Sequence, residues 1–481
     1  MGNVKKQTIN NFIWKFAERI VAQLVTFVVS IILARCLNPE DYGVVAIVTV
    51  FITIANVFVS DGLGSALIQK KDSDILDFSS VFYANILFSF LLYALLFFCA
   101  PLVSSLYEMP ILTPVMRALG LRIPLAAINS IQQAYVSRKM IFRKFFLATF
   151  VGTVLSAIVG IYMAMNGFGV WALVAQYLIN SLVGTIVLWI TVKWRPAFVF
   201  SLERLKVLLQ YGSKILAVGL LTSIYNEIRS LIIGKKYTSA DLAFYNRGHQ
   251  LPHLFVTNIN ASIIGVLFPV VSKVQDDKAT LKRYTKLSIK ISNYLMAPLM
   301  LGLFVVSDNL IPLLLTEKWN ACIPFLKVFC ISYLLLPMQT ANIQAIKAMG
   351  RAGTYLKIEV TKKIVGMALL LISIPFGPLA IAYSAALASV SSSVINSYPN
   401  RKLLDYSYFE QIGDILPNIV IAGIMAVVVW VVGAINCNLF AKLFIQICVG
   451  ALTYLLLSII TRNTCFKYLI GILRGKIKKR Q

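Results

Sequence analysis

Apolar runs of about twenty residues, separated by short polar loops, recur along the whole chain. A run of this length is long enough for a helix to cross the hydrocarbon core of a bilayer, which is about 30 Å thick. The pattern predicts about fourteen transmembrane helices, near residues 11–36, 43–62, 79–101, 111–135, 145–166, 168–192, 212–234, 242–270, 287–306, 321–345, 356–375, 377–398, 414–434 and 440–461. The predicted fold class is therefore an all-α integral membrane protein.

The composition agrees with this fold class. The chain has 481 residues, of which 59% are hydrophobic and 13% charged, and its mean hydropathy is +0.80. These values are too apolar for a soluble protein of this length. No predicted loop is long enough to hold a soluble catalytic domain, so we predict that the protein is not an enzyme.

Two kinds of cofactor chemistry find no support in the sequence. The seven cysteines are scattered and form no C-x-x-C pair, so they predict neither a disulfide framework nor a metal site. No phosphate-binding G-x-x-x-x-G-K-[ST] loop occurs, and ATP hydrolysis within this chain is therefore excluded as the energy source. We expect no cofactor, only a coupling ion, which would be H⁺ or Na⁺.

A weak internal repeat divides the predicted helices into two groups. The stretch at 31–43 matches that at 231–243, with Asp41 over Asp241, and "NGFGVWALV" (166–174) matches "IPFGPLAIA" (374–382) in the same order. Such repeats are common in transporters. We therefore predict two pseudo-symmetric six-helix bundles, followed by two additional C-terminal helices.

This repeat defines four predicted regions. They are an N-terminal bundle, a cytoplasmic interfacial linker, a C-terminal bundle, and a last region with two helices and a basic tail: residues 1–194, 195–214, 215–400 and 401–481.

The distribution of charge predicts the orientation in the membrane. With the N-terminus inside, 31 of the 45 Lys and Arg residues fall in segments predicted to be cytoplasmic or within three residues of them, and only five lie in or within three residues of outer loops. This is the positive-inside pattern, and it places both termini in the cytoplasm. The net charge of +26 then indicates contact with anionic membrane lipids, and we predict no binding of nucleic acid.

Ionisable residues also occur inside predicted spans, where they are costly and tend to face a cavity. They cluster on five helices: Lys15, Glu18 and Arg19; Arg117 and Arg122; Glu227 and Arg229; Arg247, His249 and His253; Glu359, Lys362 and Lys363. Cations predominate among them, which suits an anionic ligand such as a phosphate or pyrophosphate. The predicted cavity residues are Lys15, Arg19, Arg229, Arg247, Lys362 and Lys363.

Other interpretations of these residues stay open. Lys15, Lys362 and Lys363 lie near predicted cytoplasmic helix ends, from which they could extend to the lipid headgroups. Glu359 could pair with Lys363 one turn away. The spacing of His249 and His253 is that of some zinc sites, but no acidic residue follows His249 as such sites require, so we predict no metal.

The stretch "LNPEDYGVVAIVTVFITIANVFVSDGLGSALIQKKD" (37–72) resembles the N-terminal region of polysaccharide exporters and Wzx-type O-antigen flippases. These proteins belong to the multidrug/oligosaccharidyl-lipid/polysaccharide superfamily. The L-x-P-E-D-Y-G turn and the D-G-L-G-x-A-L-I-Q-x-K-D ending carry the resemblance. Two alternatives share the superfamily: a lipid II-type peptidoglycan precursor flippase, and a drug/cation antiporter, for which an acidic cavity would be expected.

The resemblance implies a flippase of the bacterial inner membrane. Its partners would be an undecaprenyl-pyrophosphate-linked oligosaccharide, membrane lipids, and the polysaccharide polymerase and chain-length machinery. By position, Lys15, Arg19 and Arg247 would bind the substrate. From depth and spacing we add Arg229, Lys362 and Lys363 to the residues expected to bind the substrate. We also expect Glu227 or Glu359 to couple transport to an ion, and Asp61 to pair with Lys15 as an inner latch.

Overall fold

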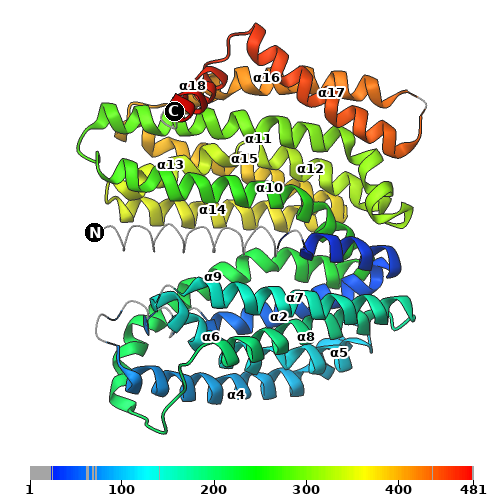
Figure 1. The fold of residues 1–481 in the computed structure, drawn as a ribbon, viewed down its shortest axis with the longest axis vertical. Coiled ribbons are helices and arrows are strands. Elements are labelled where there is room, and N and C mark those ends of the chain that lie inside the picture. The colour runs from blue at the N-terminus through cyan, green and yellow to red at the C-terminus, as the bar shows by residue number, and fades with distance from the viewer. Residues whose placement is uncertain are drawn as a thin grey trace. The chain divides into compact units, whose positions relative to one another are not determined.

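The computed structural model describes residues 23, 25–60, 64, 66, 67, 70, 73–139, 141–435 and 437–478, without the side chains of 142, 211, 266 and 472–478. Its chain falls into two compact units, Met1–Ala243 and Phe244–Gln481, here called the N-terminal and the C-terminal unit (Figure 1). The boundary lies within one helix, α10. All regular structure in the described ranges is helical.

The N-terminal unit is a helical bundle. It contains the helix Val25–Cys36, followed by α2 (Pro39–Ser60), α4 (Ile75–Tyr107), α5 (Leu112–Gly120), α6 (Arg122–Lys139), α7 (Phe142–Met165), α8 (Val170–Thr191), α9 (Leu202–Lys236) and the first residues of α10 (Ser239–Ser272).

The C-terminal unit continues α10 and adds the remaining helices. They are α11 (Lys278–Leu315), η1 (Glu317–Cys322), α12 (Ile323–Tyr333), α13 (Leu336–Ala348), α14 (Ala352–Ser373), η2 (Ile374–Phe376), α15 (Pro378–Leu403), α16 (Tyr408–Gly433), α17 (Leu439–Ile460) and α18 (Thr464–Lys478).

The all-α membrane fold is confirmed, but the number of fourteen spans is not. In the part of the chain that the structure describes, eleven helices are long and apolar enough to cross a membrane. The three other predicted spans differ for separate reasons. Half of residues 11–36 lies outside the described ranges, and the described half contains the short helix Val25–Cys36. Residues 111–135 form most of the two short helices α5 and α6, and 356–375 forms most of α14, which carries four charged side chains.

The two units repeat the same order of elements. In each, a long helix (α4 or α11) precedes a broken pair (α5 and α6, or α12 and α13) and then a helical hairpin (α7 and α8, or α14 and α15). Gly169 and Gly377, which the sequence repeat aligns, both have positive φ angles, +53° and +104°, and directly precede α8 and α15. Glycine suits both positions because residues with a side chain rarely adopt this backbone conformation.

The repeat also extends to the starts of α2 and α10. Asp41 accepts a hydrogen bond from the backbone N–H of Asn38 at 3.2 Å, and Asp241 accepts one from Thr238 at 3.1 Å. The two helices start exactly 200 residues apart, at Pro39 and Ser239. This agreement supports the duplication inferred from the sequence. The four region boundaries stay predictions.

The stretch predicted as a linker packs into the N-terminal unit. Residues 192–201 are non-helical, and α9 then continues from Leu202 through the predicted span 212–234 without a break. Trp194, Leu205 and Leu208 are buried in a core cluster with Phe78 of α4. Leu205 and Leu208 therefore anchor this segment to the bundle, whereas Phe198 is fully exposed. Its role as a linker stays a prediction.

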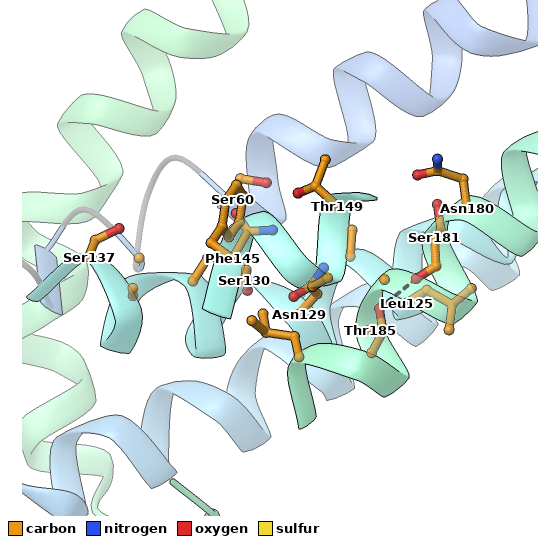
Figure 2. Close-up of a pocket in the computed structure, with 17 residues that line it drawn as sticks. Ser60, Leu125, Asn129, Ser130, Ser137, Phe145, Thr149, Asn180, Ser181 and Thr185 are labelled. Carbon is orange, nitrogen blue, oxygen red and sulfur yellow. Dashed lines mark hydrogen bonds between the residues drawn. The ribbon is translucent and has the colours of Figure 1, made fainter. Parts of the chain in front are cut away.

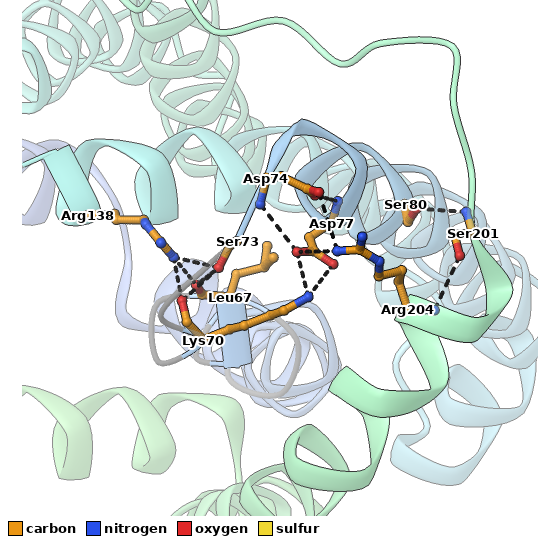
Figure 3. Close-up of polar contacts among 9 residues, drawn as sticks. All are labelled: Leu67, Lys70, Ser73, Asp74, Asp77, Ser80, Arg138, Ser201 and Arg204. Atoms are coloured by element: carbon orange, nitrogen blue, oxygen red, sulfur yellow. Dashed lines mark hydrogen bonds and ion pairs between the residues drawn. The ribbon is translucent and has the colours of Figure 1, made fainter.

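A polar network fixes the junction between α2 and α4 (Figure 3). Lys70 forms an ion pair of 2.6 Å with Asp77, which is fully buried, and Arg204 of α9 lies 3.5 Å from the same carboxylate. Asp74 caps α4, and the backbone N–H that Asp77 donates to it lowers the pKa of the Asp74 carboxyl below its usual value. Arg138 donates to the backbone carbonyls of Leu67 and Lys70. The network thus joins α4, α6 and α9 at one end of the unit.

Candidate functional site

The N-terminal unit contains a cavity of about 370 Å³ between α2, α6, α7 and α8 (Figure 2). This volume lies in the usual range for small-molecule sites. The cavity runs from the middle of the bundle to the end where α2 and α6 finish and α7 begins. By the charge pattern of the sequence, that end is predicted to face the cytoplasm.

Amide and hydroxyl side chains dominate the polar lining. They are Ser60 of α2, Asn129, Ser130, Gln133 and Ser137 of α6, Thr149 of α7, and Asn180, Ser181 and Thr185 of α8. None of the described residues that line the cavity is ionisable. Small residues, among them Ala126, Ala134, Ala148 and Gly184, complete much of the wall and keep the space open.

The sequence of α6 explains why its polar groups reach the cavity. Asn129, Gln133 and Ser137 follow each other at four-residue intervals and therefore share one helix face. Ala127 and Ile131 lie on the opposite face and are fully buried. The helix is thus amphipathic inside the bundle, with its polar face toward the cavity.

Hydrogen bonds leave part of the polar lining available. The hydroxyl of Ser130 donates to the Ala127 carbonyl at 2.9 Å, and that of Thr185 to the Ser181 carbonyl at 2.7 Å. Their oxygen atoms can still accept hydrogen bonds. The Asn129 Oδ1 atom is buried and has no hydrogen-bond partner among the described residues. A buried carbonyl oxygen without a donor is costly, so this atom is an unused acceptor beside the cavity.

One cation borders this neutral cavity. Arg122 of α6, which the sequence analysis noted among the intramembrane cations, donates from Nε to the Ser181 hydroxyl at 3.3 Å. Its guanidinium lies 5.0 Å from the centre of the Tyr177 ring. Arg122 therefore holds Ser181 in place and brings positive charge to the edge of the site.

Two of the predicted site residues lie on α9 of the N-terminal unit. Arg229 is partly buried, its guanidinium lies 5.8 Å from the centre of the Tyr225 ring, and its Nε atom is buried without a hydrogen-bond partner among the described residues. Glu227 is also partly buried. A buried guanidinium nitrogen without an acceptor is a suitable donor for an anionic ligand. Lys15, Arg19 and Asp61 lie outside the described residues.

The other predicted site residues belong to the C-terminal unit. Arg247 is buried and donates to Gln250 Oε1 at 2.8 Å, with its guanidinium 5.2 Å from the centre of the Trp319 ring. On α14, Glu359 forms an ion pair of 2.8 Å with Lys362. The sequence had suggested the next residue, Lys363, as the partner of Glu359. The structure thus brings Glu359 and Lys362 together, whereas Arg229 and Arg247 belong to different units.

The two histidines of α10 stack on each other. The ring centres of His249 and His253 are 4.8 Å apart, and Phe329 lies against His249 at 4.9 Å. His249, His253 and Phe329 thus form an aromatic cluster. In the described ranges, no group of three His, Cys, Asp or Glu side chains is placed to hold a metal ion.

The sequence analysis missed the cavity because it considered only ionisable groups within the spans. The available signal was the concentration of neutral polar residues in "INSIQQAYVS" (128–137), inside a span predicted from its apolar neighbours. Asn180 and Ser181 in the middle of another span gave the same signal.

Solved transporter structures have the same fold. The chain matches a structure of the lipid II flippase MurJ in an inward closed conformation, with a TM-score of 0.78, 17% sequence identity, and 95% of this chain and 99% of that one covered. It also matches an inward-facing multidrug resistance transporter of the MATE family, with a TM-score of 0.63, 15% identity, and 80% and 94% covered.

Curated relatives are similar over most of the chain. The succinoglycan biosynthesis transport protein ExoT of Rhizobium meliloti is 25% identical over 72% of this chain and 70% of its own length. The lipopolysaccharide biosynthesis protein WzxC of Escherichia coli is 24% identical over 86% and 82%. The teichuronic acid biosynthesis protein TuaB of Bacillus subtilis is 26% identical over 73% of each chain.

A family model described as polysaccharide biosynthesis protein matches residues 32–324, which is more than half of the chain. The match includes the 37–72 stretch and the whole cavity of the N-terminal unit. The chain therefore belongs to this polysaccharide biosynthesis protein family.

Proposed function

We propose that this protein is a flippase that carries an undecaprenyl-pyrophosphate-linked oligosaccharide from the inner to the outer leaflet of the bacterial cytoplasmic membrane. The names of its relatives, which concern succinoglycan, lipopolysaccharide and teichuronic acid, support a polysaccharide precursor as cargo. Movement would occur by alternating access, in which the binding site opens to one side of the membrane at a time.

The neutral polar cavity of the N-terminal unit is the observation that carries this proposal. A sugar presents many hydroxyl groups, and each can donate to an amide or hydroxyl oxygen and accept from an amide nitrogen. Asn129 and Gln133 offer such groups. The amide nitrogen of Asn180 already donates to Thr153 and Ser156, so this residue offers its oxygen. Burying them around an open space is unfavourable unless a polar ligand satisfies them. In this proposal the oligosaccharide does so.

The pyrophosphate requires positive charge, which the intramembrane cations would supply. Arg229 offers a buried Nε atom without an acceptor, and Arg247 is held by Gln250 and Trp319 in a buried position. An arginine can bind two phosphate oxygens at once. We assign Lys15, Arg19, Lys362 and Lys363 to the same role, and Asp61 to an inner latch with Lys15. Exchanging the charges of Asp61 and Lys15 would test the latch: failure to recover the export that each single change loses would remove it.

The lining also distinguishes this proposal from a drug/cation antiporter. A site for cationic drugs needs acidic groups in its wall, because a buried cation must be paired. The described lining of the cavity contains none. The same absence of charge suits neutral sugar rings.

Transport would be coupled to an ion through Glu227 of α9 or Glu359 of α14. Glu359 already pairs with Lys362, whereas Glu227 lies near Arg229 in the sequence of one helix, where its charge state would affect the binding of an anion. We therefore favour Glu227. Normal export by Glu227→Gln at every pH and sodium concentration tested would remove it from this role.

The proposed function is tested by deleting the gene and measuring lipid-linked sugars by mass spectrometry. We expect an undecaprenyl-pyrophosphate-linked oligosaccharide to accumulate on the cytoplasmic leaflet and surface polysaccharide to be lost. The wild-type protein and the control Lys214→Ala, an exposed cation of α9, should restore both, whereas Arg229→Ala at equal protein level should not. A deletion strain without such accumulation would contradict the proposal.

A further inference from the structure

A second pocket, of about 510 Å³, lies in the C-terminal unit between α11 and α18. Its lining includes Arg283, Lys286 and Lys290, which recur at intervals of three and four residues and therefore share one face of α11. The pocket is separate from the neutral cavity of the N-terminal unit, and its chemistry is different.

A ladder of ion pairs connects the same part of α11 to α16. Lys282 pairs with Glu410 at 3.2 Å, and Lys286 pairs with Glu410 at 3.5 Å and with Asp414 at 3.0 Å. The last ion pair of the ladder, between Lys290 and Asp414, is the longest at 3.6 Å.

These carboxylates do not balance the cations. Between residues 282 and 290, α11 carries four positive side chains, and α16 contributes two carboxylates to the ladder. Arg283 is exposed and is within ion-pair distance of no described carboxylate; its guanidinium lies 5.4 Å from the centre of the Tyr284 ring, and its charge acts on Asp277 only at longer range. This part of α11 therefore carries two more positive charges than the ladder neutralises, and Arg283, Lys286 and Lys290 among its cations border the pocket.

Apolar groups form the remaining wall. Tyr284 and Leu287 of α11 and Tyr468 of α18 line the pocket beside the three cations. The sequence of α18 combines the apolar residues of "YLIGIL" (468–473) with the basic residues Lys467, Arg474, Lys476 and Lys478. A basic amphipathic helix of this kind lies at a membrane surface. The pocket thus combines positive charge with an apolar wall.

We propose that this pocket binds the phosphate of an anionic phospholipid, with Arg283 and Lys290 as the phosphate ligands and the apolar wall against the start of the acyl chains. Arg283 can bind two phosphate oxygens, and Lys290 adds a point charge. Lys286 is held by both carboxylates of the ladder and positions the site. Basic pockets between membrane helices recognise anionic lipid headgroups by the same combination. Occupancy joins α18 to α11 and thereby stabilises the C-terminal unit.

The test uses the full-length protein purified in detergent and measures its thermal unfolding midpoint as phosphatidylglycerol is added, with phosphatidylcholine as the neutral comparison. We expect only phosphatidylglycerol to raise the midpoint. The double variant Arg283→Gln, Lys290→Gln should bind it about 30-fold more weakly, because each cation near a lipid surface contributes about 1 kcal/mol. The control Arg351→Gln, Lys357→Gln removes the same charges from exposed positions outside the pocket and should behave as wild type.

The single variant Arg283→Gln separates binding from folding, because Arg283 takes no part in the ladder. It should retain the wild-type midpoint without lipid and lose most of the response to phosphatidylglycerol. An equal response of the wild type and both pocket variants would overturn the proposal. The proposal would also be overturned if inorganic phosphate raised the unfolding midpoint as much as phosphatidylglycerol does, because the site would then bind free phosphate and not a lipid.

Discussion

The helices α6 and α13 hold corresponding places in the two units, and both carry amide side chains into a bundle interior. On α13, Asn342 donates to Gln411 of α16 at 2.6 Å and to Ser397 of α15 at 3.1 Å. It also accepts from Asn400 at 2.6 Å, and all four side chains are fully buried. On α6, by contrast, Asn129 and its neighbours border an open cavity.

A helix outside the repeat contributes to this difference. Gln411 belongs to α16, which follows the duplicated elements and fills the interior of the C-terminal unit with a partner for Asn342. The polar face of α6 has no such partner and stays available. The same kind of side chain thus stabilises the fold in one unit and forms a candidate binding surface in the other. This assignment leads to three predictions, which we order from the largest expected effect to the smallest.

The largest effect is expected in the cavity. The double variant Asn129→Leu, Gln133→Leu removes two groups that would bind sugar hydroxyls, each worth about 1 kcal/mol, so export of polysaccharide should fall about 30-fold. Stability should not decrease, because leucine suits an apolar bundle. Surface polysaccharide and membrane protein level, measured on the same cells, check both parts. Undiminished export at normal protein level would show that the cavity is not part of the transport path.

An intermediate effect is expected for Gln411→Leu in the C-terminal unit. The change leaves the Asn342 amide and the Ser397 hydroxyl without their shared acceptor and should lower the free energy of unfolding by about 2 kcal/mol. The thermal midpoint in detergent should fall, and export should fall only as far as the amount of folded protein does. Loss of export by a stable, abundant variant would instead assign Asn342 and Gln411 to transport.

The smallest effect is expected at the two aligned glycines. Gly169→Ala and Gly377→Ala place alanine in a backbone conformation that it rarely adopts. Each change should lower the free energy of unfolding by about 1 kcal/mol. The control Gly353→Ala lies inside α14, where an added methyl group meets no other atom, and should be neutral or slightly stabilising. Thermal unfolding measures all three. A neutral Gly377→Ala beside a costly Gly169→Ala would break the equivalence of the two hairpins.

The sequence was sufficient for the fold because the strongest determinants of a membrane bundle are local. Length and hydropathy identified most spans, and a few aligned residues such as Asp41 with Asp241 and Gly169 with Gly377 revealed the repeat. The breaks between α5 and α6 and between α12 and α13 were not predicted. A break of one or two residues between helices does not change the hydropathy of an apolar run. The break at Leu121, between α5 and α6, is an example.

The candidate site was harder to predict because it depends on packing between helices. Arg229 and Arg247 could be identified as costly charges inside spans. The cavity, however, exists because α6, α7 and α8 place small and neutral polar residues against one another, which no single segment specifies. Lys70 shows the same limit: the sequence indicates a positive charge at a cytoplasmic end, whereas its ion pair with the buried Asp77 depends on the fold.

The central claim is that the protein itself moves a lipid-linked oligosaccharide across the bilayer, and transport in proteoliposomes tests it most directly. The lipid-linked oligosaccharide that accumulates in the deletion strain would be incorporated with purified protein, and its appearance on the outer face would be followed with an impermeant sugar-binding probe. We predict rapid transfer with the wild-type protein and a rate about 30-fold lower with Asn129→Leu, Gln133→Leu. Transfer no faster than in protein-free liposomes would contradict the account.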